Sequence, residues 1–537
     1  MTLALHNADD SCLINQTVPA VGVASSPSVH DEKSQLPNPH PAGANPPHPE
    51  PGAPVSCPSA EEDEKHGDHV ADKSTAAAEA APTSSRESVV AGDSVHARAD
   101  ADADANAGGG GGGDNEYDDD DDDDDFPEGG LRAWLVVLGS FCAMLSVYGL
   151  INSAAVFESY FSTHQLAGYN PSAIGWIFSV YLFVVFFAGV QVGPIFDRHG
   201  PRVLVTVGGV LVVASQLLLG LCKEYYQILL TYSILGGLGG ALLNVPAYGV
   251  IAHFFRVRRG LATGIASTAG SIGGIVLPVY LQWALPRLGF GWSTRAVGFV
   301  LLLLSAIATL LVRARLPPSP RPVTVLPDWS LFRDLKFLLC CVGVWFMEWG
   351  IFTPLTYIVS YAVAHGQGGE GASAATDAYT LLALLNAGSF FGRFLPGFLA
   401  DRLGRFNVIT LTNGLCVAAI LCLWLPAGDS RAMLIAFAVA FGFASGSNLG
   451  LYPVCVGQLC DSRDYGRFYS TTLMVGSFGT LTSLPIAGAL LGIGGGAASD
   501  QGWLALILFA ALSYAIAMSC FLGVRVLAVS WRVKEVY

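Results

Sequence analysis

The sequence predicts an all-α membrane protein with about twelve transmembrane helices in two pseudo-symmetric six-helix bundles, preceded by an acidic tail. The 537 residues are 52% hydrophobic and only 13% charged, which is too apolar for a soluble protein of this length. From Leu131 onward, apolar stretches of about 20 residues recur, each long enough to cross a bilayer of about 30 Å as a helix. Short motifs of the first half also return in the second half.

Residues 1–126 form the predicted tail. They are rich in Pro, Ala, Gly, Ser and acids, and they include the runs GGGGGG (108–113) and DDDDDDDD (118–125). Such a segment cannot bury enough apolar surface to offset the entropy of ordering it, so we expect it to be disordered. The aspartate run is interpreted as a solvated spacer, with binding of calcium or of a basic partner as the alternative. The start, MTLALHNADDSC, lacks the regions of a signal peptide, so we expect the tail to be cytosolic.

The apolar stretches set the order of the predicted spans. A proline-rich, positive connector, RARLPPSPRPVTVLPDW (313–329), separates the sixth span from the seventh. We therefore predict a first bundle over 127–315, a cytosolic linker over 316–335 and a second bundle over 336–537. The spans are centred, in order, near Met144, Val184, Val212, Leu238, Gly270, Leu303, Glu348, Phe390, Cys416, Phe441, Gly476 and Leu512.

The distribution of charge predicts the orientation. The net charge of −14 comes from the tail, because residues 1–130 hold 28 of the 42 acidic residues but only 5 of the 28 basic ones. In the remaining chain about 17 Lys and Arg fall in even-numbered loops or at the C-terminus, and four fall in odd-numbered loops. By the positive-inside rule both termini are cytosolic. The expected destination of this multi-pass protein is the plasma membrane, with the vacuolar membrane as the alternative.

Several functional classes are excluded. The eleven cysteines are scattered without metal-ligand or paired spacing, so we interpret them as small buried hydrophobes. A nucleotide-binding loop, a His-rich metal cluster and a nucleophile elbow are all missing from the sequence. We therefore predict no enzyme activity, no cofactor, no metal site and no nucleic acid partner. Two repeated halves suit rocking rather than a fixed pore, which disfavours a channel.

The two halves echo each other in three places. The stretch GPIFDRHGPR (193–202) returns 204 positions later as GFLADRLGR (397–405). At the same offset Asn244 and Tyr248 fall on Asn448 and Tyr452, and two positions further GSIG (270–273) falls on GSFG (476–479). Three matches in near register argue for an internal duplication.

The repeated loops resemble the signature loop of the major facilitator superfamily, Gly-x-x-x-Asp-Arg-x-Gly with a following Arg, over about residues 128–530. This resemblance implies the major facilitator fold and loops that act as gates. Glycine permits a tight turn, and the aspartates can accept hydrogen bonds from helix N-termini or arginines. Breaking such contacts on one face would let two bundles rock, as alternating access requires; the alternative is that the loops only tie helices together. The predicted gate residues are Gly193, Asp197, Arg198, Gly200, Arg202, Gly397, Asp401, Arg402, Gly404 and Arg405.

Four stretches resemble more narrowly the fungal members of the monocarboxylate porter family. They are PEGGLRAWLVVLGSF (127–141), YGLINSAAVFESYF (148–161), EWGIFTPLTYI (348–358) and NAGSFFGRFLPGFLADRLGR (386–405). The resemblance implies that Arg393, in the eighth span, binds a substrate carboxylate. The animal lactate carriers of that family have lysine at the position of Asn152 and aspartate at that of Ser389, so this chain departs from proton-coupled lactate transport. Fungal members handle varied substrates, including vitamins and secondary metabolites.

Arg393 and Glu348 are charges inside predicted spans. A mid-bilayer arginine costs roughly 2.5 to 3.5 kcal/mol on insertion scales, so it usually faces a polar cavity. The Arg393 guanidinium suits bidentate binding of a carboxylate, and Asn386, Ser389 and Arg393 share one helical face. Glu348 is the candidate for proton coupling. The alternative is a permanent ion pair between Glu348 and Arg393 that binds nothing.

Neutral side chains in the spans complete the predicted substrate site. The alternative for each is hydrogen bonding between helices, worth about 0.6 to 2 kcal/mol in membranes. These candidates are Asn152, Asn244, Tyr248, Tyr357, Asn448 and Tyr452.

The leading functional hypothesis is a secondary active transporter that moves a small organic acid, monocarboxylate-like, or a related metabolite by alternating access. A proton is the candidate coupling ion. One alternative is efflux of a fungal secondary metabolite, and another is a non-transporting nutrient sensor that signals through its tail. The expected partners are an anionic small-molecule substrate, a proton and membrane lipid.

Overall fold

Helices run through every described part of the chain. The computed structural model describes residues 126–319, 327–365, 372–493 and 499–530, so the predicted tail lies outside it except for Phe126. The first half contains α1 (Gly130–Asn152), α2 (Ala154–Thr163), α3 (Pro171–Phe187), α4 (Gly189–His199), α5 (Arg202–Leu219), α6 (Tyr225–Ile228), the π-helix η1 (Leu229–Gly236), α7 (Gly237–Phe254) and α8 (Arg259–Leu311). The second half contains the 3-10 helix η2 (Trp329–Arg333), α9 (Leu335–Ala364), α10 (Ala372–Leu403), α11 (Arg405–Ala419), the π-helix η3 (Ile420–Trp424), α12 (Arg431–Val456), α13 (Tyr465–Leu491) and α14 (Asp500–Val529).

Within the described residues, eleven helical runs are long and apolar enough to cross a membrane. One of them, α8, has 53 residues. At 1.5 Å per residue such a helix is about 80 Å long, more than twice the thickness of a bilayer core. Gly289 interrupts it with φ 71° and ψ 167°, a backbone conformation that favours glycine. Because α8 crosses twice, the prediction of about twelve crossings is confirmed, as is the all-α class. Each predicted centre lies inside a described helix.

The first span is broken where it approaches the middle of the bundle. Ser153 separates α1 from α2, is fully buried, and donates its hydroxyl to the carbonyl of Gly149 at 2.8 Å. Irregular backbone is tolerated at membrane depth where protein surrounds it, because every polar group still finds a partner. The break leaves Asn152 as the last residue of α1.

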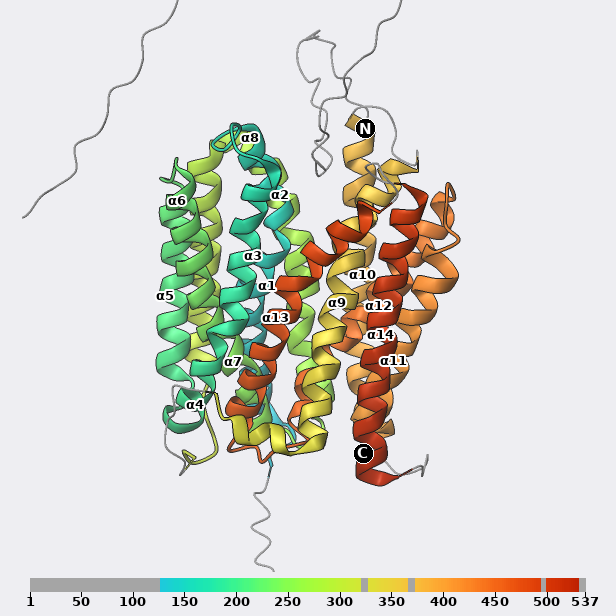
Figure 1. Ribbon diagram of the computed structural model, residues 1–537. Helices are drawn as coiled ribbons and strands as arrows, with labels where there is room; N and C mark the ends of the chain where they lie inside the picture. Colours follow the sequence, from blue (N-terminus) through green and yellow to red (C-terminus); the bar gives the residue numbers. More distant parts are fainter. Residues whose placement is uncertain (1–125, 320–326, 366–371, 494–498, 531–537) are drawn as a thin grey trace, which may run out of the picture. The chain divides into compact units, whose positions relative to one another are not determined.

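The two halves meet along α8 and α13. Helix α8 packs against α10 and α12 of the second half, and α13 packs against α3, α4 and α7 of the first half. Figure 1 shows α13 next to α3 and α7. Glycine allows this approach: a Cβ added to Gly397 would lie 2.6 Å from the carbonyl oxygen of Gly260. Small residues at such crossings bring helix backbones together in membranes.

One end of the bundle gathers the basic loops. Helices α4, α7, α10 and α12 finish there, and α5, α8, α11 and α13 begin there. We call it the basic end; it carries Arg198, Arg202, Arg256, Arg258, Arg402, Arg405 and Arg463. The positive-inside rule predicts that this end faces the cytosol.

Candidate transport site and gates

Arg393 lies buried in α10, where this helix crosses α8. Its side chain is only 6% exposed. The Nη1 group donates to the backbone carbonyl of Ser267 at 2.9 Å, and Nε donates to Ser389 Oγ at 3.3 Å. Arg393 stands ten residues before the end of α10, which is about 15 Å and half of a bilayer core. The guanidinium therefore reaches from the second half to the first at mid-membrane depth.

Two of the predicted asparagines meet beside Arg393. Asn386 of α10 and Asn152 of α1 both lie against Gly274 of α8: an added Cβ there would be 2.6 Å from Asn386 Oδ1 and 3.2 Å from Asn152 Cγ. One helical turn earlier, an added Cβ on Gly270 would be 2.9 Å from Arg393 Nη1. Three predicted substrate residues thus line one face of α8, and they come from both halves.

Tyrosines fill the space between Arg393 and the basic end. Tyr248 of α7 and Tyr452 of α12 lie on two sides of Tyr469 of α13, and all three are at most 2% exposed. The ring centroids of Tyr248 and Tyr469 are 5.2 Å apart, and the hydroxyls of Tyr452 and Tyr469 are 3.4 Å apart. Tyr248 and Tyr452 also lie within electrostatic range of Arg393. Sequence analysis missed Tyr469, because it stands outside the repeated motifs.

The asparagines of the repeat occupy different environments despite their matching positions. Asn244 Oδ1 accepts a hydrogen bond from Tyr148 Oη at 3.1 Å, which links α7 to α1 near the site. Asn448 instead faces α11, where its Oδ1 accepts from Thr412 at 2.6 Å and from Asn413 at 3.4 Å. Asn448 therefore makes hydrogen bonds between helices, which was the alternative to substrate binding for this residue. Tyr148 was missed, although its position one turn before Asn152 is a signal that could have found it.

Tyr357 lies apart from the predicted site residues around Arg393. Its hydroxyl lies 3.4 Å from a Cβ added to Gly488 of α13. Tyr357 stands nine residues after Glu348 in α9, about 13 Å further along the helix. It lies toward the end opposite the basic end.

Glu348 is a buried acid without an ionic partner among the described residues. It is 3% exposed, and its Oε2 has no hydrogen-bond partner in this part of the chain. It packs against α13, where its Cβ lies 3.4 Å from the position of a Cβ added to Gly479. The alternative of a permanent ion pair with Arg393 is wrong, because Arg393 donates to Ser267 and Ser389 instead. Tyr452 lies within electrostatic range of both Glu348 and Arg393.

The aspartates of the two repeated loops each hold the start of a helix in the other half. The four bonds, all 2.8 Å, run from the N–H groups of Gly260 and Leu261 to Asp401, and from those of Gly466 and Arg467 to Asp197. Asp401 thus caps the N-terminus of α8 and Asp197 that of α13, where the helix dipole favours negative charge. This is one of the two contacts that the sequence predicted for these residues.

Arg259 is a further link between the halves at the basic end. It is 3% exposed and donates to Gly457 O at 2.6 Å and Ser462 Oγ at 2.7 Å in the second half. In the first half it donates to Phe255 O at 3.0 Å and Ala252 O at 3.3 Å. These carbonyls end α7 and α12, where the dipole favours a cation. In the sequence Arg259 is only one of the basic loop residues, because its partners are three backbone carbonyls and a serine hydroxyl that no pattern reveals.

Comparison with known proteins decides the family. The sequence profile described as Major Facilitator Superfamily matches residues 136–483. The chain belongs to the major facilitator superfamily. As a member, it is a multi-pass membrane transporter of a small molecule and not an enzyme.

Named relatives and a solved structure agree with this assignment. The riboflavin transporter MCH5 of Saccharomyces cerevisiae is 35% identical over 429 residues, 76% of this chain and 80% of that protein. The aspyridones efflux protein apdF of Emericella nidulans is 36% identical over 373 residues, 69% of this chain and 74% of that protein. The human organic anion transporter MFSD10 has a TM-score of 0.54 at 17% identity and covers 72% of this chain and 98% of its own, which shows the shared fold.

The other predicted gate residues of this superfamily member have distinct positions. Gly200 and Gly404 follow α4 and α10 with φ 77° and φ 93°, where a residue with a side chain would be strained. Arg405 donates to the backbone carbonyl of Arg256 and so bridges the halves. Arg402 is exposed and stacks over Phe398, with its guanidinium carbon 4.3 Å from the ring centroid. The remaining members lie in α4 or at the start of α5: Gly193, Arg198 and Arg202.

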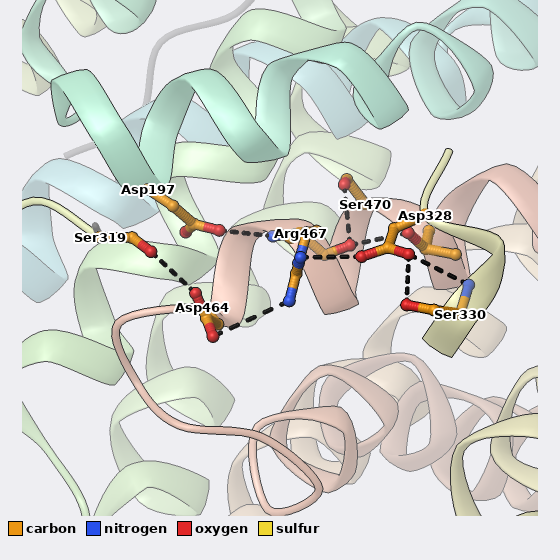
Figure 2. Close-up of polar contacts among 8 residues, drawn as sticks. Asp197, Ser319, Asp328, Ser330, Asp464, Arg467 and Ser470 are labelled. Carbon is orange, nitrogen blue, oxygen red and sulfur yellow. Dashed lines mark hydrogen bonds and ion pairs between the residues drawn. The ribbon is translucent and has the colours of Figure 1, made fainter. Parts of the chain in front are cut away.

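The linker between the halves contacts the same predicted gate. Figure 2 shows Arg467 bonded to Asp328 at 2.8 Å and Ser319 donating to Asp464 at 2.9 Å. Ser319 also donates its N–H to the carbonyl of Asp197 at 2.9 Å. Both described ends of the linker therefore contact the start of α13 that Asp197 caps.

Proposed function

We propose that this transporter exports an anionic organic metabolite by alternating access between its two halves. The observation that carries the proposal is Arg393, a buried guanidinium at mid-membrane depth where helices of both halves meet. A charge in this position is expensive unless it serves a ligand, and a guanidinium matches a carboxylate or another oxyanion. Asn386 and Asn152 extend the site along α8.

The gate contacts support alternating access. Asp401 and Asp197 bind helix N-termini across the halves at the basic end, and Arg259 adds a third link there. Binding at mid-membrane with reversible contacts on one side fits rocking of two bundles around a central site. In this arrangement the basic end is closed, so the proposed cycle opens it by breaking these contacts.

The named relatives support efflux of a metabolite over uptake of a simple monocarboxylate. The aspyridones efflux protein is 36% identical to this chain. A second candidate is transport of a vitamin, which the 35% identity with the riboflavin transporter supports. Membership of the fungal branch of the monocarboxylate porter family and a plasma-membrane location with cytosolic termini remain part of the proposal. The sensor hypothesis has less support, because these relatives are described as transporters or efflux proteins.

Glu348 is the proposed site of proton coupling. Its Oε2 is buried without a hydrogen-bond partner in the described chain. A charged carboxylate is costly there, so the neutral acid suits this conformation. Tyr452 lies within electrostatic range of both Glu348 and Arg393, which offers a route by which proton release affects the substrate site.

The test compares metabolites in cells and medium by untargeted mass spectrometry. A fungal host would carry the wild-type chain, the Arg393→Ala variant or an empty vector, with expression matched by immunoblot. We expect at least one organic acid to move from cells to medium only with the wild-type chain. Accumulation of that acid inside the cells would show that the proposed direction is wrong and that the chain takes the acid up. Equal redistribution by wild type and Arg393→Ala would remove the anion-binding role.

A further inference from the structure

The hydrogen-bonding atoms around Arg393 restrict the chemistry of the ligand. Nη1 and Nε of Arg393 are engaged by Ser267 O and Ser389 Oγ, whereas Nη2 makes no hydrogen bond within the described chain. The N–H groups of Nη2 thus remain able to donate. This argument rests on the proposed function of Arg393.

The two neighbouring asparagines present acceptors. Asn152 Nδ2 donates to Tyr148 O at 2.9 Å and Gly270 O at 3.1 Å, and Asn386 Nδ2 donates to the carbonyl of Leu382 at 3.0 Å. Because both nitrogens are tied to backbone carbonyls, the orientation of each carboxamide is fixed. Neither Oδ1 accepts a hydrogen bond from any described residue, and both side chains are half-buried.

The spacing of donor and acceptors follows from α8. Arg393 Nη2 lies 3.3 Å from the position of a Cβ added to Gly270, and Asn386 Oδ1 lies 2.6 Å from that of a Cβ added to Gly274. Residues four apart on a helix lie about 6 Å from each other. The cationic donor and the acceptor pair are therefore separated by about one helical turn.

We infer that the site takes an acid that also carries an O–H or N–H donor about 6 Å from its acidic group. The acidic group of the ligand accepts hydrogen bonds from Nη2 of Arg393. The donor of the ligand binds Oδ1 of Asn386 and of Asn152. An α-hydroxy acid is too short to reach both. A ligand of the same size without the donor desolvates the carboxamide oxygens without compensating them, so the site disfavours it.

The test measures binding of three probes to the purified full chain in nanodiscs by isothermal titration calorimetry. The probes are 4-hydroxybenzoate, whose hydroxyl lies across the ring from its carboxylate, 4-methoxybenzoate, which lacks the donor, and 2-hydroxybenzoate, whose donor is adjacent to the acid. We expect 4-hydroxybenzoate to bind about tenfold more tightly than either of the others, the factor that one additional hydrogen bond gives.

Two variants assign the preference to these atoms. Asn386→Leu should remove the preference, because it weakens binding of 4-hydroxybenzoate by removing an acceptor and relieves 4-methoxybenzoate of an uncompensated carboxamide oxygen. Gly274→Ala places a methyl group against Asn386 Oδ1 and should also remove the preference. Asn170→Leu is the matched control at an exposed position outside the site, and it should keep the preference.

The outcomes separate this inference from the proposed function. Equal affinities of wild type for all three probes, with all binding lost in Arg393→Ala, would overturn the donor requirement and keep the anion site. A preference that persists in both Asn386→Leu and Gly274→Ala would also overturn it. Unchanged binding of 4-hydroxybenzoate by Arg393→Ala would instead reject the proposed role of Arg393.

Discussion

At the scale of single residues, the chemistry of the site depends on which partners each buried charge has. Two nitrogens of Arg393 donate to neutral acceptors, Ser267 O and Ser389 Oγ. Oε2 of Glu348 has no hydrogen-bond partner among the described residues. A buried arginine and a buried glutamate are both costly inside a membrane, and a permanent ion pair between them would lower that cost. Their separation therefore favours distinct roles in transport.

Replacement of Arg393 should abolish transport without loss of the protein. Arg393→Ala and Arg393→Lys are both expected to lower the rate by at least about a hundredfold, because neither side chain presents a planar fork to an oxyanion. Expression should survive, since the backbone carbonyl of Ser267 belongs to helix α8. Efflux of the metabolite identified above, normalised to protein in the membrane, is the measurement.

Arg287→Ala is the matched control for this prediction. Arg287 is an exposed arginine of α8, with its guanidinium carbon 5.2 Å from the ring centroid of Trp283, and it should tolerate the change. Full transport by the Arg393→Ala variant would contradict the anion-binding role. Loss of transport in Arg287→Ala as well would indicate a general sensitivity to the loss of an arginine.

Replacement of Glu348 should remove the pH dependence of transport. Glutamine has nearly the same shape as the neutral acid but cannot release a proton, so Glu348→Gln fixes that form. We expect a flat rate between pH 5 and pH 8 in sealed vesicles, where coupling by one proton changes the rate by up to about tenfold per pH unit. Glu224→Gln, at an exposed acid, should keep the wild-type profile. An unchanged profile in Glu348→Gln would reject proton coupling at this residue.

At the scale of helices, the proposed gates are contacts between helix ends of the two halves. Asp197 and Asp401 cap α13 and α8 across the halves, and Arg259 joins the C-terminal ends of α7 and α12. These contacts use the partial charges of helix termini. They form only where the ends of α7, α8, α12 and α13 meet. Opening the basic end therefore breaks them together.

Substitution of the capping aspartates should loosen the basic end. In Asp197→Asn or Asp401→Asn one acceptor becomes an NH2 group that faces helix N–H groups, at a cost of about 1 kcal/mol for each cap. Cys460 is a free, half-buried thiol next to Arg259 and reports the opening. We expect its alkylation to be about fivefold faster, as measured by mass spectrometry.

Two further variants control the interpretation of this measurement. Arg259→Gln removes different contacts at the same end and should also speed alkylation of Cys460. Asp334→Asn replaces an aspartate that caps its own helix, α9, and should leave the rate unchanged. If Asp401→Asn alkylates no faster than Asp334→Asn, the gate role of Asp401 is wrong.

At the scale of the whole molecule, the sequence predicted those features that depend on local pattern. The spans followed from hydrophobic length, because a bilayer core requires about 20 apolar residues for each crossing. The paired gate loops followed from the repeat, and so did the acceptor role of Asp197 and Asp401. The partners of Arg259 and Tyr469 could not be predicted, because they are set by tertiary packing. Asn244 and Asn448 show the limit of the repeat, since equal positions met different neighbours.

Glu128 anchors the N-terminal end of the described chain. Glu128 accepts hydrogen bonds from the N–H groups of Arg256 and Val257 at 2.6 Å and of Arg258 at 2.9 Å. These three residues lie in the connection between α7 and α8, next to the start of α8 that Asp401 caps. A chain that begins at residue 126 therefore retains this anchor.

Deletion of residues 1–125 should leave transport intact. The transport site and the gates lie entirely within the described residues, and Glu128 keeps the start of α1 in place, so we expect the rate to stay within about twofold of wild type. Efflux of the identified metabolite from vesicles containing the truncated chain is the measurement. Glu128→Ala in the full chain is the contrasting variant, since it removes the anchor while keeping the tail. A truncated protein that inserts normally but does not transport would restore the hypothesis of a signalling or regulatory tail.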